Sequence, residues 1–366
     1  MNIFFLTETE SGCYKWRGAI PAKYLRRRGH TVQILSDDFQ AYEAPDVMVI
    51  FRAHYPDANR IVEWCKQRSI RVVFDTDDAL DRVPRENVHY RELQGRLDLY
   101  HFLLEQADVV TTTTPVLAAD LRQRNPNVVV LPNSADAEEW TVLPRGLSSQ
   151  DDVRVGWTGS ATHFHDLAVA LPAIRELQKR HPFTLVLQGL CDRTDLQTFY
   201  AELVSVHGKP FLNSPLGKSI KRFLEDLAGI RYEFHPMVNF DRHAGTVCEL
   251  ALDIGIAPLV EDSFNRNKSC VKYYEYALSG ALTVASRVLP YSAEVPITAR
   301  NSRQSWKETL EPLLDADRRA DRDRMWREQR DWILTHRNME RNVELWEQVY
   351  RGELTSSGAA ADQNAA

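Results

Sequence analysis

Residues 253–286 contain two lysines and a glutamate at a spacing that could bind a phosphorylated ligand. The segment has the pattern of a buried strand, then a polar loop, then a helix that begins near Asn267 to Ser269. Free N–H groups at a helix start, reinforced by the helix dipole, suit a phosphate. Lys268 and Lys272 are four residues apart, so we expect them on one helix face, where they would add positive charge.

Glu275 follows Lys272 by about one helical turn. A carboxylate at this point could accept hydrogen bonds from vicinal hydroxyl groups, such as those of a ribose. The alternative is an ordinary amphipathic helix with a Lys272–Glu275 pair on its surface. The residues alone leave both interpretations open.

A second candidate segment is VGWTGSATHFHDL, residues 155–167. Its small residues would let backbone N–H groups approach a phosphate, and they are Gly156, Gly159 and Ser160. His163, His165 and Asp166 resemble a metal cluster. A zinc site needs further ligands than these, and we expect no metal here.

The N-terminal part offers acidic residues directly after a buried run, with Asp75, Asp77 and Asp78 following residues 72–74. Carboxylates at the end of a strand could act on a ligand, or they could cap the turn that follows. Gly12 lies in the polar loop after the first apolar run.

Short apolar runs alternate with helical patterns along most of the chain, which indicates βαβ units and parallel sheets covered on both faces. The expected strands are residues 3–6, 31–35, 47–51, 72–74, 109–112, 128–131, 153–157, 183–188, 230–234, 254–257 and 282–285. The pattern lapses around residues 136–152, where we expect a domain junction. The fold class is therefore α/β, with two Rossmann-like, doubly wound domains whose strand ends face a shared cleft.

The expected division has four parts. An N-terminal domain covers residues 1–145, and a second Rossmann-like domain covers residues 151–314. Residues 315–351 form a long charged helical region, and residues 355–366, rich in Ser, Gly, Ala, Gln and Asn, are expected to be disordered.

The composition excludes several classes of protein. With 366 residues, 43% hydrophobic and 26% charged, the chain is an ordinary globular protein, and a net charge of −6 argues against a nucleic-acid-binding surface. Five scattered cysteines without a C-x-x-C pair fit reduced thiols in a cytosol. The start is too short and too weakly basic for a signal peptide, and no run reaches the ~20 apolar residues of a membrane span. We expect a cytoplasmic protein with at most peripheral contact to the inner face of a membrane.

The segment around Glu275 resembles the donor-binding region of glycosyltransferase family 4, the group 1 transferases with the GT-B fold. That family has two glutamates separated by seven residues, followed by a small-residue turn and a strand; Glu275, Gly280 and the run LTVAS match the second half. The resemblance implies that Glu275 contacts the ribose of a nucleotide. The first family glutamate, which touches the donor sugar, is Asn267 here, whose amide can also bind a hydroxyl.

The resemblance extends to the segment 155–167, which in the family lines the donor diphosphate. Most members carry an Arg and a Lys there, whereas this chain has Trp157 and, near the Lys position, His163. We infer that Lys268 supplies the missing charge. Gly12 matches the family's glycine-rich turn, and Asp77 and Asp78 lie where many relatives have a histidine close to the reacting sugar.

Asp75-x-Asp77 also imitates the D-x-D metal motif of the other main transferase fold, GT-A. A GT-A enzyme would not need a second α/β half containing Glu275, so we favour GT-B. The resemblance implies a hexosyltransferase that uses a nucleoside diphosphate sugar as co-substrate, retains anomeric configuration and needs no metal or other cofactor. Asp77, Asp78 and Lys268 are the expected catalytic residues.

The expected partners are a nucleotide-sugar donor, commonly a UDP- or GDP-sugar, and a glycan, lipid-linked, protein or small-molecule acceptor, as in polysaccharide biosynthesis.

Two alternative functions stay open. A nucleotide-sugar 2-epimerase uses the same kind of cleft for another reaction. A sugar-nucleotide-binding protein without catalysis would also explain Asn267 and the missing Arg and Lys.

Overall fold

The computed structural model of the chain describes residues 1–9, 11–36, 43–141, 153–160, 163–189 and 193–355. The end of the expected domain junction, residues 142–152, lies outside the described residues, and so does the expected disordered tail from residue 356. Cys191 is outside them too, and the four described cysteines are free. No helix in the described part of the chain is long and apolar enough to cross a membrane.

The N-terminal half, residues 1–141, contains a six-stranded parallel sheet in the order β2-β1-β3-β4-β5-β6. Its strands are β1 (Asn2–Leu6), β2 (Thr31–Leu35), β3 (Val47–Phe51), β4 (Arg71–Asp75), β5 (Val109–Thr112) and β6 (Val128–Val130). Alternate residues of β1 point to opposite faces, since Ile3 and Phe5 belong to one apolar cluster while Phe4 and Leu6 belong to another. A sheet buried on both faces explains the nearly continuous apolar runs in the sequence.

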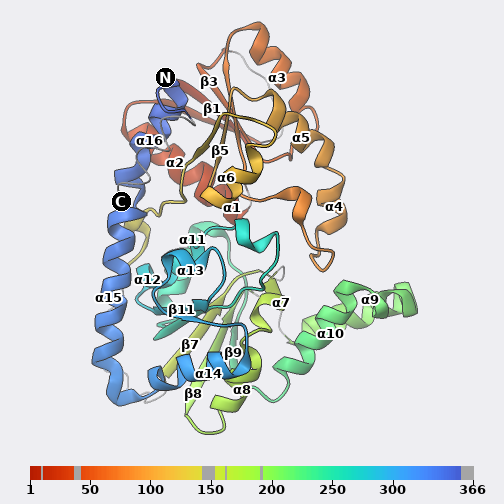
Figure 1. Cartoon of the computed structure of the whole chain (residues 1–366), viewed down its shortest axis with the longest axis vertical. Coiled ribbons are helices and arrows are strands. Elements are labelled where there is room, and N and C mark those ends of the chain that lie inside the picture. Colours follow the sequence, from red (N-terminus) through yellow and green to blue (C-terminus); the bar gives the residue numbers. More distant parts are fainter. Residues whose placement is uncertain (10, 37–42, 142–152, 161–162, 190–192, 356–366) are drawn as a thin grey trace.

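Helices cover both faces of this sheet (Figure 1). One face has α2 (Ile20–Arg27), which follows a short α1 (Gly12–Tyr14) and the π-helical turn of residues 15–19. The other face has α3 (Ala58–Gln67), α5 (Leu97–Gln106) and α6 (Pro115–Leu121). The short helix α4 (Tyr90–Gln94) packs against the edge of this cluster through the partly buried Leu93.

The second half, residues 153–314, contains another six-stranded parallel sheet, in the order β12-β11-β10-β7-β8-β9. Its strands are β7 (Val153–Thr158), β8 (Phe183–Gln188), β9 (Tyr232–His235), β10 (Ile254–Ala257), β11 (Leu282–Ser286) and β12 (Thr298–Ala299). Its helices are α7 (Phe164–Leu167), α8 (Leu171–Leu177), α9 (Arg193–Asn213), α10 (Pro215–Leu227), α11 (Phe240–Glu249), α12 (Val271–Ser279), α13 (Tyr291–Glu294) and α14 (Arg303–Leu310). The helices α9 and α10 form a hairpin that projects from this half (Figure 1).

The C-terminal helical region is two helices rather than one, α15 (Arg319–His336) and α16 (Met339–Arg351). The break falls at Asn338, whose side chain accepts from the Glu340 N–H as an N-cap while its backbone bridges to Ala135. Helix α15 packs on α12 and β11 of the second half, and α16 packs on α2 of the first. The chain thus returns to the N-terminal half at its end (Figure 1).

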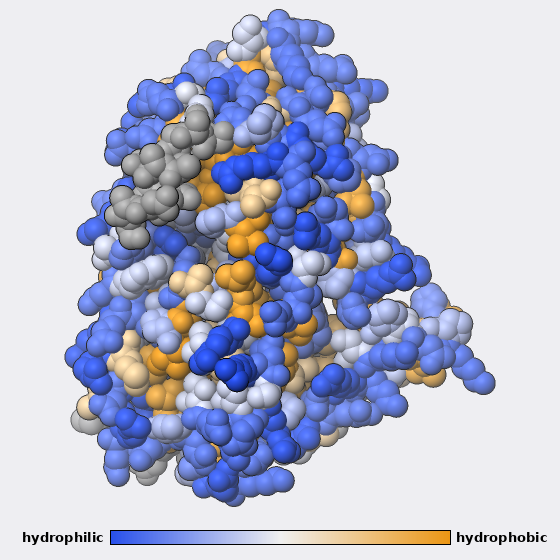
Figure 2. Space-filling view, in the orientation of Figure 1, coloured by the Kyte–Doolittle hydropathy of each residue, from blue (hydrophilic) through white to orange (hydrophobic). Residues whose placement is uncertain are grey.

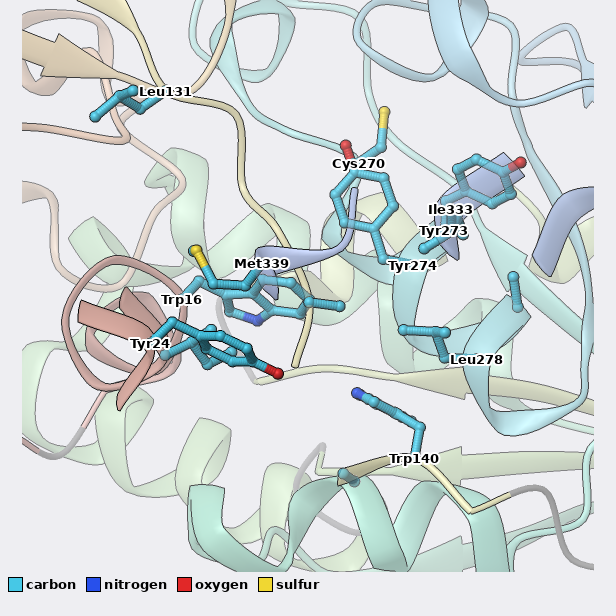
Figure 3. Close-up of a cluster of buried hydrophobic side chains, with 14 of the residues drawn as sticks. Trp16, Tyr24, Leu131, Trp140, Cys270, Tyr273, Tyr274, Leu278, Ile333 and Met339 are labelled. Atoms are coloured by element: carbon cyan, nitrogen blue, oxygen red, sulfur yellow. The ribbon is translucent and has the colours of Figure 1, made fainter. Parts of the chain in front are cut away.

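The two halves share one apolar cluster. Figure 3 shows side chains of this cluster, among them Trp16 and Tyr24 of the first half, Cys270 and Tyr274 of the second, and Met339 of α16. The rings of Trp16 and Tyr274 have centroids 6.1 Å apart. On the surface, Figure 2 shows polar side chains over most of the face seen in Figure 1, with apolar ones gathered along its middle.

Candidate functional site

The carboxyl ends of the two sheets face each other. Three N-terminal residues that follow strand ends, Gly12, Thr114 and Asn133, each contact the second half. A Cβ atom on Gly12 would lie 3.0 Å from the ring of Phe240 at the start of α11, so glycine leaves room for this contact. Ligands of open parallel sheets bind at such edges.

Helix α12 begins at Val271, later than the sequence pattern predicted. Lys268 precedes the helix in extended conformation, so the prediction that Lys268 and Lys272 share a helix face is wrong. The two ammonium groups are still close enough for Lys268 to lower the pKa of Lys272. The first N–H groups of α12 have no acceptor within the helix, as at every helix start.

Lys272 lies against the end of strand β7. Its Nζ is 2.5 Å from the carbonyl oxygen of Thr158 and 4.9 Å from the ring centroid of Trp157. Burial lowers the pKa of Lys272 to about 8, and Lys268 contributes to this while Glu275 opposes it. A Cβ atom on Gly159 would lie 2.7 Å from this Nζ and 2.7 Å from the Trp157 ring, so a larger residue here would displace one of them.

The small residues of the segment 155–160 have other contacts than the expected phosphate. Gly156 lies inside β7, where a Cβ atom would come within 2.3 Å of Leu252, so its smallness serves packing. The Gly159 N–H donates to the carbonyl of Gln188 at 3.0 Å, and the Ser160 carbonyl accepts from the His163 N–H at 3.1 Å. The expectation that the Gly156 and Gly159 amides face a ligand is therefore not met by this geometry.

His163 forms a close pair with Asp166, with 2.8 Å between Nδ1 and Oδ2. The other oxygen of Asp166 accepts from Val260 N–H at 2.8 Å and from the Asn265 amide at 3.2 Å. Burial, together with Lys268, lowers the pKa of His163 to about 3, so the ring is neutral at pH 7. Asp166 must then accept from Nδ1–H, which leaves Nε2 as an acceptor. His163 therefore supplies no positive charge at the position where the family carries a lysine.

Glu275 is only 7% exposed, and its Oε1 lies 3.2 Å from Nε2 of His243 on α11. Burial lowers the pKa of His243, but the Glu275 carboxylate outweighs it and raises that pKa above its ordinary value. The alternative of a surface Lys272–Glu275 pair is excluded, because α12 is buried from Tyr273 to Ser279.

Asn267 has no exposed surface. Its Nδ2 donates to the Ser263 carbonyl at 2.8 Å, and its Oδ1 is buried with no hydrogen-bond partner in the described part of the chain. The neighbouring Ser269 accepts from Asn133 Nδ2 at 2.8 Å. The amide nitrogen of Asn267 is thus already engaged within its own loop.

Across from this loop, Asp77 and Asp78 share one cation. Arg52 donates from Nε to Asp77 at 2.7 Å and from Nη2 to Asp78 at 2.7 Å, and Nη2 also lies 2.8 Å from Cys13 Sγ. Burial raises the pKa of Asp77, but Arg52 outweighs it and holds that pKa below its usual value. Burial and the neighbouring Asp77 raise the pKa of Asp78, against the opposing charges of Arg52 and Lys268.

Asp75 does not belong to this cluster. It is 1% exposed and accepts two hydrogen bonds from Arg17, at 2.9 and 2.5 Å, and one from Thr111 at 2.6 Å. A D-x-D metal site is therefore not formed by Asp75 and Asp77. Among the described residues, no group of three or more His, Cys, Asp or Glu side chains could hold a metal ion.

Sequence reasoning missed three residues of the site. Arg52 follows β3 in the left-handed region with a φ of 58°, His243 lies on α11, and the Tyr276 hydroxyl accepts from the Thr158 N–H at 2.9 Å. The position of Arg52 directly after a buried strand was the one available signal, the same one that marked Asp77 and Asp78.

A cavity of about 320 Å³ opens at the ends of β1 and β3 in the N-terminal half. Its polar lining includes Glu8, Arg52, His54 and Tyr55. Burial lowers the pKa of His54 to about 4 although Glu8 lies 3.4 Å away, so this ring is neutral at pH 7. Because Arg52 also binds Asp77 and Asp78, the cavity adjoins the carboxylate cluster.

Comparison with known proteins identifies the fold. No protein-family model and no curated protein matches the chain. Solved structures do match along nearly its whole length. HepE from Anabaena, solved with UDP and glucose, has a TM-score of 0.65 at 12% identity, covering 95% of this chain and 99% of that one. The catalytic domain of starch synthase IV from Arabidopsis thaliana, bound to ADP and acarbose, has 0.63 at 10% identity, covering 96% and 99%.

A glycosyltransferase from Rickettsia africae is similar as well, with a TM-score of 0.59 at 12% identity over 96% of this chain and 98% of that one. These structures are GT-B proteins. At sequence identities this low, the structural similarity is evidence for the fold alone. The chain has the GT-B architecture of two facing parallel α/β sheets.

Proposed function

We propose that this protein is a glycosyltransferase that takes a sugar from a nucleoside diphosphate sugar bound between its two halves. The observation that carries the proposal is the meeting of Lys272 with the end of β7. Its Nζ lies 2.5 Å from Thr158 O, with Lys268 nearby and the buried Glu275 one turn further along the helix. The fold neighbours solved with UDP or ADP support a nucleotide at such an edge.

The donor would lie against α12. Lys268, Lys272 and the N–H groups at the very start of the helix, before Tyr273, would stabilise the charge of the departing diphosphate. Glu275 would accept hydrogen bonds from the ribose hydroxyls, and the bare Nε2 of His163 would accept one from the donor sugar. We assign the donor to residues 151–314, as in glycosyltransferase family 4.

The acceptor would lie in the N-terminal half, residues 1–145. The 320 Å³ cavity with Glu8, His54 and Tyr55 supports this side, because carboxylate, imidazole and phenol groups can all hydrogen-bond sugar hydroxyls. Asp77 and Asp78 lie between this cavity and Lys268, where the reacting carbon would be. A glycan or a lipid-linked glycan would fit an open site of this kind, with the enzyme in the cytoplasm or at the inner face of a membrane.

We further propose that the reaction retains anomeric configuration and needs no metal. The charge that a metal would neutralise is met by Lys268 and Lys272, since a lysine beside a phosphoryl group stabilises developing negative charge. The residues 315–351 would hold the two halves together during the reaction, because α15 packs on the second half and α16 on the first.

A thermal-shift screen against UDP, ADP, GDP, dTDP and CDP sugars tests the proposal. A ligand at a hundred times its Kd stabilises a protein by about 2.7 kcal/mol, which moves Tm by several degrees. The best donor is then incubated without acceptor. Slow release of the nucleoside diphosphate and free sugar supports a transferase, whereas a sugar epimer identifies an epimerase. Binding without any turnover, even with a panel of acceptors, indicates a binding protein, and no binding of any nucleotide refutes the proposal.

A further inference from the structure

Two hydrogen bonds from the N-terminal half hold the loop that contains Lys268. Thr114 Oγ1 donates to the backbone carbonyl of Asn267 at 3.0 Å, and Asn133 Nδ2 donates to Ser269 Oγ at 2.8 Å. The two acceptors belong to the residues directly before and after Lys268. The backbone at this lysine is therefore held on both sides by the opposite half of the molecule.

The hydroxyl of Thr114 is itself fixed by helix α6. Thr114 is the N-cap of that helix, and its Oγ1 accepts from the Leu117 N–H at 3.2 Å. A hydroxyl has one proton to donate, and with the N-cap bond using it as an acceptor, that proton is free to go to the Asn267 carbonyl. The position of α6 therefore determines where Thr114 holds the loop.

The amide of Asn133 is fixed in a similar way from the core of the N-terminal half. Its Oδ1 accepts from Arg17 Nη1 at 3.2 Å, and the same nitrogen donates to the Leu131 carbonyl at 2.6 Å. Arg17 in turn is held by Asp75 through two hydrogen bonds. With its oxygen turned to Arg17, the amide must present its nitrogen to Ser269. A continuous set of polar contacts thus runs from β4 to the loop of Lys268.

We propose that Thr114 and Asn133 are positioning residues that set Lys268 against the departing diphosphate. This inference rests on the proposed function, because Lys268 has that task only if a nucleotide sugar binds here. Both bonds cross between the halves, so these two bonds to the loop exist only while the halves are in contact. In this proposal, Lys268 reaches its reactive position when the two halves come into contact.

Substitutions can remove the hydrogen bonds to the loop of Lys268 while the N-cap of α6 is kept. Thr114→Asp keeps a side-chain acceptor for the Leu117 N–H but removes the hydroxyl donor to Asn267, whereas Thr114→Ser keeps both. Asn133→Ala removes the donor to Ser269. Asn127→Ala is the matched control, because Asn127 donates to the Asp108 carbonyl at 2.7 Å within the N-terminal half.

The first measurement is hydrogen exchange by mass spectrometry on the peptide of residues 265–272, without nucleotide. We expect exchange at least about threefold faster in Thr114→Asp and Asn133→Ala, and unchanged in Thr114→Ser and Asn127→Ala, because the loop loses its ties only in the first two. Unchanged exchange in both Thr114→Asp and Asn133→Ala overturns the proposal.

The second measurement is the turnover of UDP-glucose by hydrolysis, with the Kd of UDP measured by calorimetry. We expect kcat to fall at least about tenfold in Asn133→Ala, since small displacements of a catalytic group reduce rates strongly, while the UDP Kd stays within about threefold. Full kcat in this variant overturns the positioning role. If the unmodified protein binds and hydrolyses none of the nucleotide sugars of the thermal-shift screen, the proposed function is at fault, and the exchange measurement still decides whether Thr114 and Asn133 hold the loop.

Discussion

His243 Nε2 lies 3.2 Å from Oε1 of Glu275, and this contact joins helices α11 and α12. One carboxylate oxygen is thereby directed to the imidazole, so in the proposed function the second oxygen would accept from the ribose. The contact also fixes the rotamer of Glu275, which a ribose-binding carboxylate requires.

Glu275→Ala should weaken the binding of UDP by about 1.5–3 kcal/mol, the range for hydrogen bonds to a charged group. This corresponds to an increase of Kd of about tenfold to a hundredfold. Calorimetry measures it, and circular dichroism checks that the helix persists, as alanine favours helices. Glu249→Ala, which removes an exposed acid from α11, serves as the control. A folded Glu275→Ala protein with unchanged UDP affinity would disprove the ribose assignment.

Nucleotide affinity should fall as pH rises through about 8, the lowered pKa of Lys272. Below this pH the ammonium is charged and attracts the diphosphate, and above it the amine is neutral. A bound diphosphate raises the pKa of Lys272, so the affinity declines between the pKa of the free protein and the higher pKa of the complex.

UDP binding is measured at pH 7.5 and at pH 9.5, both for the unmodified protein and for Lys272→Arg. The guanidinium of the variant stays charged over this range, so the titration of other groups affects both proteins equally. UDP binding by the unmodified protein should weaken relative to this variant as the pH rises. Parallel pH profiles for the two proteins would show that Lys272 does not touch the diphosphate.

Gly159→Ala should impair nucleotide binding without unfolding the protein. The new Cβ would lie 2.7 Å from Lys272 Nζ and 2.7 Å from the Trp157 ring, so the lysine must move away from Thr158. Gly245→Ala on α11 is the matched control, because no atom lies within 4 Å of a Cβ there. We expect at least about a tenfold rise in the UDP Kd for Gly159→Ala, the loss of one charge-assisted contact, and none for Gly245→Ala. Equal affinities in the two variants would contradict the placement of Lys272 in the site.

Much of the fold could be predicted from the sequence because its strands are buried on both faces. Runs such as residues 47–51 and 128–130 are continuously apolar, and this pattern does not depend on tertiary detail. The two-residue strand β12 was missed because it is too short to carry a pattern. The break at Asn338 was missed because an N-cap inside a long charged region depends on the bridge to Ala135.

The site could be predicted only in part. Glu275 and Lys272 stand in a helix with a recognisable pattern, and the structure brings both to the edge of the sheet. Asn133 could not be found, because its importance comes from a partner 136 positions away in the chain. Arg52 was missed although its place directly after a buried strand was a signal, because its partner Asp77 lies 25 positions away. The neutral state of His163 also depends on burial, which follows from packing and not from residue type.

Removal of divalent ions should leave the activity unchanged. Asp75, the first residue of the D-x-D pattern, is bound to Arg17 in the core and is not available to a metal. Turnover of UDP-glucose is measured after treatment with EDTA and again after adding Mn²⁺ or Mg²⁺. Loss of activity with EDTA and recovery with metal would contradict the expectation.

Asp75→Ala should destabilise the fold by about 3–5 kcal/mol in urea unfolding, because it leaves Arg17 as an unpaired buried charge.

The product should keep the anomeric configuration of the donor. An inverting transferase needs a general base within hydrogen-bond reach of the acceptor hydroxyl, on the face opposite the leaving group. Asp77 is a poor base because Arg52 lowers its pKa. In a retaining reaction the departing phosphate oxygen takes the acceptor proton on the same face, and the protein mainly stabilises the diphosphate, for which Lys268 and Lys272 are suited.

NMR of the first product formed from an α-linked donor such as UDP-glucose decides between the two courses. An α linkage supports retention, and Asp78→Asn should then lower kcat only modestly, because no carboxylate has to remove the proton. A β linkage contradicts retention and makes Asp78 the candidate base. Burial and the adjacent Asp77 raise its pKa, and a higher pKa makes a carboxylate a stronger base. In that case Asp78→Asn should abolish transfer while UDP still binds. These two results together would identify Asp78 as the base that removes the proton of the acceptor hydroxyl.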